Sequence, residues 1–344
     1  MKKIILPLVT VAFLAACSDS NDDANFVAPS GQTGVVSSSS VAVVPPTSSE
    51  VVPPASSAAV VPPSGDVSSS SAATVPLSSA AGTPTDPQFT YSVPTLTELN
   101  PGLSYTFYGA ELTGVEQFKY GRFEARMKMA SISGSVSSMF LNYDNSWMKE
   151  YEPWNEIDIE ILGKDPSKWQ SNIITREGDP SIKKNTSSEV IHPFAFDATK
   201  EFHLYAIIWT PEYVAWEIDS VEVRRDTLGM SRGKHADGDQ VKFMTEEQTL
   251  RFNLWASKTP SWTGKFTGEG LPVEQHIDYV RVYAYDVGTK AFTLSWQDDF
   301  EGDWFDTKRW SAGNWEMENV KYRDLNIRVE NGFVKLRLDY ELKQ

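Results

Sequence analysis

The stretch that most constrains the fold is WNEIDIEILG, residues 154–163, in which acidic side chains alternate with isoleucines. Side chains of a β-strand point alternately to its two faces. Glu156, Asp158 and Glu160 are therefore predicted to share one face of a strand, while the isoleucines between them point into a hydrophobic core. The strand then presents a row of acids on one surface of a sheet.

Three like charges on one strand face are costly, because each carboxylate makes ionisation of its neighbours harder. Glycoside hydrolysis needs such a set, since one carboxylate acts as nucleophile or base while another keeps its proton at neutral pH. The alternative is an ordinary half-solvated strand of an antiparallel sheet. The aromatic residues Trp147, Tyr151 and Trp154 favour the first interpretation, because flat rings suit the C–H faces of sugars.

The first quarter of the chain is not expected to belong to the folded domain. Residues 1–17 combine MKK with an apolar run and predict a signal peptide. It ends in LAAC, which resembles the bacterial lipobox, so Cys17, the only cysteine, is the expected site of lipidation. The alternative is a plain secretory signal. We expect an exported protein anchored by lipid to the bacterial cell envelope, at the outer membrane or cell surface, with no other membrane contact.

Residues 18–87 are rich in Ser, Pro and Val, and the unit VVPP recurs at 43, 51 and 60. Paired prolines favour extended backbone and exclude helix, so this segment is predicted to be a disordered tether. An interaction or glycosylated segment is the alternative. Residues 88–344 are predicted to form one catalytic all-β domain, for which this length is ordinary.

Charge and motifs exclude several classes of function. A net charge of −15 argues against nucleic acid and disfavours anionic polymers, which leaves a neutral β-glucan as a compatible polysaccharide partner. The histidines show no HExxH spacing, and the chain has no cysteine pair for zinc, no GxSxG and no phosphate-binding loop. We therefore expect that catalysis needs no cofactor. We also expect the protein to be a monomer.

The folded part is predicted to consist of strands and turns. Short segments rich in aromatic and β-branched residues alternate in part with period two at 120–129, 202–209, 213–218 and 279–283. Turn signals such as Asp219-Ser220 and Asn331-Gly332 separate the strands. No long stretch has helical periodicity. We expect a sandwich of two antiparallel sheets with one concave face free to hold a polymer.

Several motifs resemble glycoside hydrolase family 16, a jelly-roll β-sandwich family that acts on β-glucans. They are EIDIE at 156–160, YGRFEARMK at 120–128, SGSVSSMF at 133–140, RFNLW at 251–255 and HIDYVRVY at 276–283. The uninterrupted EIDIE resembles the form in the 1,3-1,4-β-glucanases (licheninases) of the family, whereas laminarinase-type members insert a residue. The resemblance implies endo-acting cleavage of mixed-linkage glucan with retention.

The order of the motifs is unusual for that family. FTLSWQDDF at 292–300, RWSAGNW at 309–315 and the segment 329–338 resemble the family's usual N-terminal strands, yet they lie near the C-terminus. The resemblance therefore implies a circularly permuted domain. Permutation is tolerable because the termini of a domain often lie close together at its surface.

By the resemblance, Glu156 is the nucleophile, Glu160 the acid/base, and Asp158 orients the nucleophile and helps to set its charge. The α-carbons of the two Glu lie about 13 Å apart along an extended strand. Retaining enzymes need carboxyl groups about 5–5.5 Å apart, and inverting enzymes about 6.5–9.5 Å. Because the two long Glu side chains can lean toward each other, the spacing allows either distance. The retaining assignment therefore rests on the family.

Substrate contacts and a metal site are carried over in the same way. The expected substrate residues are Phe140, Trp154, Gln170, Asn172, Arg251, Asn253 and Trp255. At Asn142 the chain departs from the pattern of the permuted members, which has Tyr, so subsite specificity stays open. A structural Ca²⁺ is also implied, held by Asp278 with the carbonyls of Asp299 and Gly332.

Three other functions remain open on the same fold. They are a β-1,3-glucanase, a transglycosylase acting on xyloglucan, and a catalytically silent glucan-binding protein. A binding protein has no need of the acidic triplet, which argues against the last.

Overall fold

The computed structural model describes residues 94–146, 152–176, 186–230 and 239–343. The predicted signal peptide, Cys17 and the predicted tether lie outside the described residues and stay predictions, as does the domain boundary at 88. Within the described ranges, regular structure other than strands is limited to α1 (Pro260–Thr263) and η2 (Asp324–Asn326). Neither is long and apolar enough to cross a membrane.

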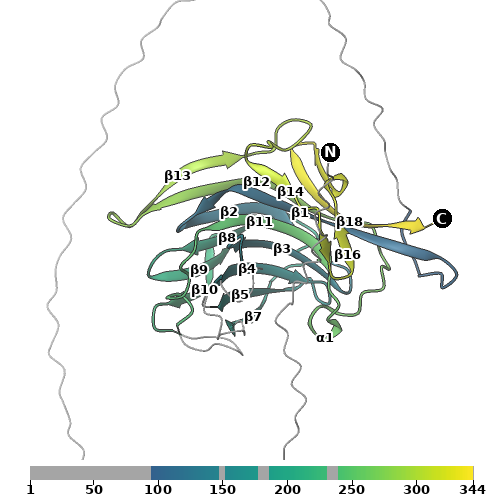
Figure 1. The fold of residues 1–344 in the computed structure, drawn as a ribbon, viewed down its shortest axis with the longest axis horizontal. Coiled ribbons are helices and arrows are strands. Elements are labelled where there is room, and N and C mark those ends of the chain that lie inside the picture. The colour runs from purple at the N-terminus through teal and green to yellow at the C-terminus, as the bar shows by residue number, and fades with distance from the viewer. Residues whose placement is uncertain (1–93, 147–151, 177–185, 231–238, 344) are drawn as a thin grey trace, which may run out of the picture. The chain divides into compact units, whose positions relative to one another are not determined.

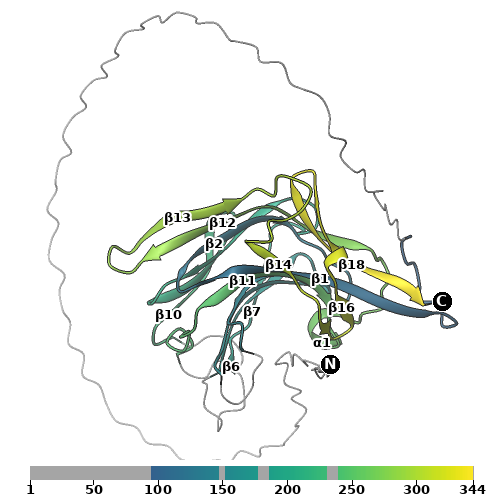
Figure 2. The ribbon, with the colours of Figure 1, turned by 45° about the horizontal axis from the view of Figure 1, so that its top comes forward.

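One layer of the domain is built around the acidic strand. Its order is β14 (Trp310–Ala312), β1 (Ser104–Phe118), β11 (Gln248–Ala256), β3 (Ser135–Asn142), β4 (Trp154–Leu162) and β5 (Lys168–Arg176). The short strands β6 (Thr186–Ser187) and β7 (Val190–Pro193), both labelled in Figure 2, pair with β5 at the far edge. All these pairings are antiparallel. β4 therefore lies inside the layer, with a partner on each side.

The second layer has the order β10 (Val221–Thr227), β9 (Tyr213–Ile218), β8 (His203–Trp209), β2 (Gly121–Lys128) and β12 (Val273–Asp286). On the side of β12 away from β2, the second half of β12 pairs with β13 (Ala291–Asp298) and its first half with β18 (Phe333–Lys343). β18 also pairs with β17 (Ile327–Glu330). Figure 1 shows the strands of the domain curving together.

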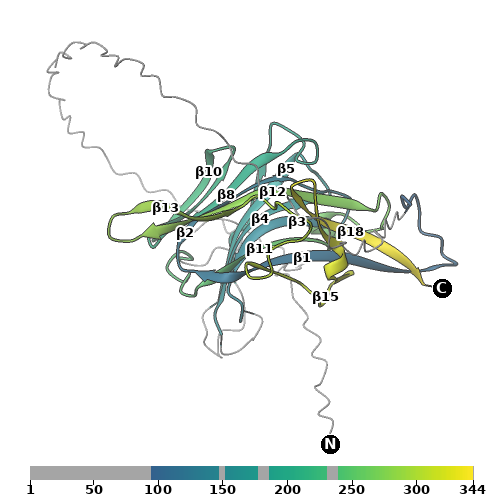
Figure 3. The same ribbon diagram turned by 90° about the horizontal axis from the view of Figure 1, so that it is seen from above.

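The two layers are joined at one corner by β1 and β18. The start of β1 pairs with the end of β18, and Figure 3 shows the two strands running side by side. Hydrogen bonding thus continues from layer to layer in one strongly curled sheet. The predicted all-β jelly-roll sandwich is confirmed. A local exception to its antiparallel pairing is the short parallel pair of β1 with β16 (Val320–Tyr322), which also pairs with β15 (Glu316–Met317).

The core lies between the layers, on the face of β4 opposite the acids. Ile157, Ile159 and Ile161 are fully buried, as the alternation predicted. Burying each such side chain contributes roughly 1.5–3 kcal/mol. Across the interface, the Trp216 indole of β9 donates to the carbonyl oxygen of Asp158 at 2.9 Å. These contacts hold β4 against the core, with its acidic side chains on the opposite face.

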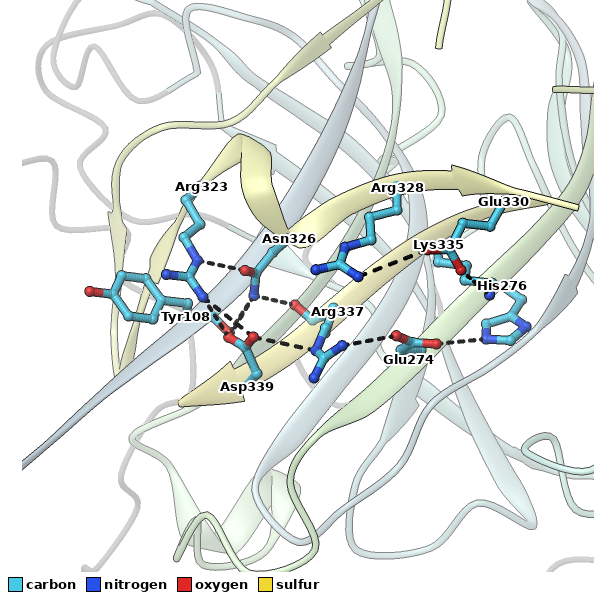
Figure 4. Close-up of polar contacts among 10 residues, drawn as sticks. All are labelled: Tyr108, Glu274, His276, Arg323, Asn326, Arg328, Glu330, Lys335, Arg337 and Asp339. Carbon is cyan, nitrogen blue, oxygen red and sulfur yellow. Dashed lines mark hydrogen bonds and ion pairs between the residues drawn. The ribbon is translucent and has the colours of Figure 1, made fainter. Parts of the chain in front are cut away.

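A chain of polar contacts ties the C-terminal strands to the rest of the domain (Figure 4). The buried Asp339 of β18 accepts a hydrogen bond from Asn326 at 2.9 Å and pairs with Arg323 at 3.2 Å and with Arg337 at 3.3 Å. Arg323 also lies over the ring of Tyr108 in β1, 3.7 Å from its centre. The C-terminal segment is thus part of the domain. Circular permutation itself stays a prediction.

Candidate active site

The registers of β3 and β5 against β4 decide which side chains join the acids. Directly opposite residues of antiparallel strands point to the same face. Asn142, Phe140 and Ser138 of β3 lie opposite Glu156, Asp158 and Glu160, and on the other side Ile174, Asn172 and Gln170 of β5 do the same. We call this face of the layer the acid face.

The next strands extend the acid face. On β11, Arg251 lies opposite Phe140, Asn253 opposite Ser138 and Trp255 opposite Val136. On β1, Glu111 lies opposite Asn253. The registers therefore bring all seven predicted substrate residues to the face that carries the three acids. Most of them are well packed: Phe140 and Trp154 are 8% exposed, and Trp255 is 4% exposed.

Glu156 is held by donors from two strands. Its Oε2 accepts from the Trp154 indole nitrogen at 2.7 Å and from the Asn142 amide at 2.8 Å. Burial raises the pKa of Glu156, while hydrogen bonds from Trp154, Asp158 and Asn142 and the charge of Arg251 act in the opposite direction. Among the three acids, Glu156 thus has the largest set of groups that favour its ionised form.

Asp158, between the two glutamates, is almost fully buried. Burial raises its pKa well above the usual range, and the charges of Glu156 and Glu160 add to the rise. A protonated Asp158 is the donor that its hydrogen bond with Glu156 requires. The role of supporting Glu156 stays a prediction.

Glu160 also retains its proton at neutral pH. Burial, then the charge of Glu156, raises its pKa to about 8, against a lowering by the Gln170 hydrogen bond. The Gln170 amide donates to Glu160 Oε2 at 2.8 Å and accepts from the Trp262 indole at 3.2 Å. Glu189, which the sequence analysis missed, adds a smaller rise through its charge. Burial thus raises the pKa of both glutamates, and Glu156 has more hydrogen-bond donors to its carboxylate than Glu160 has.

Arg251 is neutralised by two carboxylates that the sequence analysis also missed. Its guanidinium pairs with Glu111 at 3.2 Å and with Asp144 at 2.7 Å. Burial raises the pKa of Glu111, against the charge of Arg251. Asn253 accepts from Ser138 at 2.5 Å. The cation that faces the acids is therefore fixed in place, with its charge balanced.

The remaining polar and aromatic candidates flank the acids. The Asn172 side-chain oxygen accepts from the backbone N–H of Ser188 at 3.0 Å. The rings of Trp255 and Trp262 lie 5.9 Å apart, inclined at 51°. Because Trp262 also contacts Gln170, this aromatic pair stands at the Glu160 end of the acid face.

The three residues of the implied calcium site lie in different parts of the domain's strands and turns. Asp278 pairs with the guanidinium of Arg126, Asp299 accepts from Gln297 at 3.0 Å, and Gly332 lies in the turn between β17 and β18. In the part of the chain that the structure describes, no group of three or more His, Cys, Asp or Glu side chains is placed to hold a metal ion. The expected site uses one carboxylate and two backbone carbonyls, which such a group does not include, so the calcium site stays a prediction.

The domain is an all-β sandwich. One of its faces carries a row of acids with unequal sets of hydrogen-bond donors, flanked by amides and indoles. This is the architecture of the β-sandwich glycoside hydrolases. The chain belongs to the glycosyl hydrolases family 16, whose family model matches residues 80–281.

Two curated relatives and one solved structure are similar to this chain. A β-glucanase of Fibrobacter succinogenes is 44% identical over 238 residues, which are 67% of this chain and 64% of the relative. A β-glucanase of Acetivibrio thermocellus is 33% identical over 185 residues, 53% of this chain and 48% of the relative. The structure of a Bacillus licheniformis β-glucanase aligns with 50% of this chain and 69% of its own, at 28% identity and a TM-score of 0.39. The chain thus spans 64% and 48% of the length of these two curated relatives.

Proposed function

We propose that this protein is an endo-acting hydrolase of mixed-linkage β-1,3-1,4-glucan that works with retention. The observation that carries the proposal is the difference in surroundings between the Glu156 and Glu160 carboxyl groups. Glu156 accepts hydrogen bonds from Trp154 and Asn142, whereas the pKa of Glu160 is raised to about 8 on the same strand face. The β-glucanase names of the two curated relatives support the choice of substrate class.

The mechanism has two displacements. The Glu156 carboxylate attacks the anomeric carbon while Glu160 gives its proton to the departing glycosidic oxygen, which leaves a glycosyl ester on Glu156. Glu160, now ionised, takes a proton from water, whose oxygen attacks the same carbon and releases Glu156. Asp158, buried and protonated, donates to Glu156 throughout. Stereochemistry at the anomeric carbon is retained because it is inverted twice.

A neutral substrate suits the charge of the acid face. Arg251, the cation of β11 on this face, already pairs with Glu111 and Asp144. A sulfated or uronic acid polymer would bring further negative charge next to Glu156 and Glu189. The amides of Gln170 and Asn253 and the indole of Trp262 supply hydrogen bonds and apolar surface for uncharged sugars.

A panel of polysaccharides tests the proposal. Purified protein is incubated with barley β-glucan, lichenan, laminarin and xyloglucan, and reducing ends are measured. We expect release from the first two, with β-configured products in the first seconds by proton NMR. Release from laminarin alone would assign a β-1,3-glucanase, and transfer to an added acceptor from xyloglucan would assign a transglycosylase. Retardation in glucan gels without any release would indicate a binding protein.

The role of Glu156 is tested separately. Glu156→Gln should abolish turnover while the melting temperature stays near that of the unmodified protein or rises. Glu330→Gln, which changes an exposed carboxylate paired with Lys335, is the matched control and should keep full activity. Full activity of Glu156→Gln would contradict the mechanism.

We also propose that the protein is exported and anchored as a monomer through a lipid on Cys17. The support is the apolar N-terminal run that ends in LAAC. Cys17→Ser should move the protein from the membrane fraction to the soluble fraction of cells that express it. An unchanged distribution would contradict the anchor, and the sedimentation coefficient of the released protein tests the monomer.

A further inference from the structure

Asn142 is the last residue of β3 and lies directly opposite Glu156. Its amide nitrogen donates to Glu156 Oε2 at 2.8 Å, and the Trp154 indole donates to the same oxygen at 2.7 Å. The two donors reach the carboxylate from different strands. Together they restrict rotation of the carboxylate about its last side-chain bond.

Both donors are held rigidly. Asn142 is 6% exposed, and its backbone oxygen accepts from the hydroxyl of Thr249 at 3.3 Å. The guanidinium of Arg176 lies over the Trp154 indole, 5.5 Å from the ring centre, and donates to the backbone oxygen of Ser146 at 3.0 Å. The donors are therefore in place before a sugar arrives, as an efficient nucleophile requires.

We propose that Asn142 is a positioning residue for Glu156: its amide keeps that carboxylate ionised and fixes the plane in which it attacks the anomeric carbon. The inference rests on the proposed function and goes beyond it, because Asn142 stands where the chain departs from the family pattern. Asn142 contacts the carboxylate of Glu156 and acts on the reaction through it.

The other groups around Glu156 cannot replace the amide. Asp158 and Glu160 are acids on the same strand, and Arg251 of β11 already has two carboxylate partners. On β5, the residue opposite Glu156 is the apolar Ile174. Loss of the Asn142 donor thus leaves Trp154 and Asp158 as the hydrogen-bond donors to Glu156.

The direction of the effect follows from the chemistry of the hydrogen bond. A donor to a carboxylate favours its charged form, so its loss raises the pKa. Asn142→Leu should move the acidic limb of the kcat/KM profile to higher pH by about one unit, and lower kcat about tenfold with a smaller change in KM. Trp154→Phe, which removes the other donor, should move the same limb in the same direction.

Asn145→Leu is the matched control. Asn145 lies three residues away, and its amide donates to the Tyr143 hydroxyl rather than to Glu156. It should leave the acidic limb where it is. If Asn142→Leu does not fold, Asn142→Asp keeps the shape of the side chain and sets a carboxyl against Glu156, so the limb should move to higher pH by more than one unit.

A titration of the free protein separates this inference from the proposed function. Carboxyl carbons of labelled Glu are followed by NMR against pH, and the Glu156 signal is assigned from its loss in Glu156→Gln. We expect a higher pKa of Glu156 in Asn142→Leu than in the unmodified protein, whatever the polysaccharide panel gives. Superimposable titrations, or acidic limbs that coincide while only stability falls, would overturn the positioning role and leave Asn142 a packing residue.

Discussion

The raised pKa of Glu160 has a consequence for stability that does not depend on the substrate. In the unfolded chain this carboxyl ionises near 4.5, and in the folded domain burial and the charge of Glu156 raise the pKa to about 8. Below pH 4.5 both states carry the proton. Between pH 4.5 and about 8 the folded state alone holds it, so the free energy of unfolding falls as pH rises through this window. Above pH 8 the loss is complete.

Glu160→Gln removes this loss while keeping the shape of the side chain. A rise from 4.5 to about 8 is roughly 3.5 pH units, which at about 1.4 kcal/mol per unit sets an upper bound near 5 kcal/mol. Glu160 is partly exposed, so water screens its charge, and we take about 2 kcal/mol at pH 9. For a domain of this size that corresponds to a melting temperature about 4–8 °C higher than that of the unmodified protein. At pH 4 the two should melt together.

Thermal unfolding of the full chain, followed by circular dichroism from pH 4 to pH 9, measures this difference. Glu330→Gln serves again as control and should show a small difference that does not vary with pH. The decisive observation is the growth of the gap between Glu160→Gln and the unmodified protein across the window. A gap that is constant with pH, or that shrinks as pH rises, would refute the assignment of Glu160 as the protonated acid.

Three other substitutions test the structure further. Gln170→Met removes the amide that lowers the pKa of Glu160, so the alkaline limb of kcat/KM should move up by about one unit; an unmoved limb contradicts Glu160 as the acid. Arg323→Met takes one guanidinium from the buried Asp339 and should lower the unfolding free energy by about 2 kcal/mol, measured as a lower urea midpoint. An unchanged midpoint would contradict this expectation. Ile159→Ala opens a cavity behind the acids and should cost about 2–5 kcal/mol in the same urea assay, against about 0.5–1.5 for Ile159→Val, and equal losses would argue against a packed core there.

The alternation in β4 made most of its structure predictable. Period two fixes which residues share a face, and isoleucine leaves little choice about which face is buried. Gln170 and Asn172 were expected from the family resemblance, and the β4–β5 register brings both to the acid face. Local pattern therefore predicted the strand that carries the acids, and the resemblance predicted their neighbours.

The partners of Arg251 could not be predicted in this way. Glu111 lies 140 residues away along the chain and Asp144 107 residues away, and neither forms a pattern with the arginine. Their proximity depends on the β1–β11 and β11–β3 pairings, which only the folded sheet defines. A clue for Asn142 did exist, since it closely follows the motif SGSVSSMF at 133–140. The β3–β4 register was needed to use it.

The division of roles among the acids does not follow from their spacing. In the sequence, Glu156, Asp158 and Glu160 are three like charges whose mutual repulsion a strand should avoid. In the fold, burial raises the pKa of all three, and the donors are unevenly shared: Glu156 has Trp154, Asn142 and Asp158, whereas Glu160 has Gln170. Raised pKa values mean fewer charges in the row and therefore less repulsion along the strand. The uneven sharing of donors favours the ionised form most strongly at Glu156, so the features that make the strand tolerable in a folded domain also bear on its chemistry.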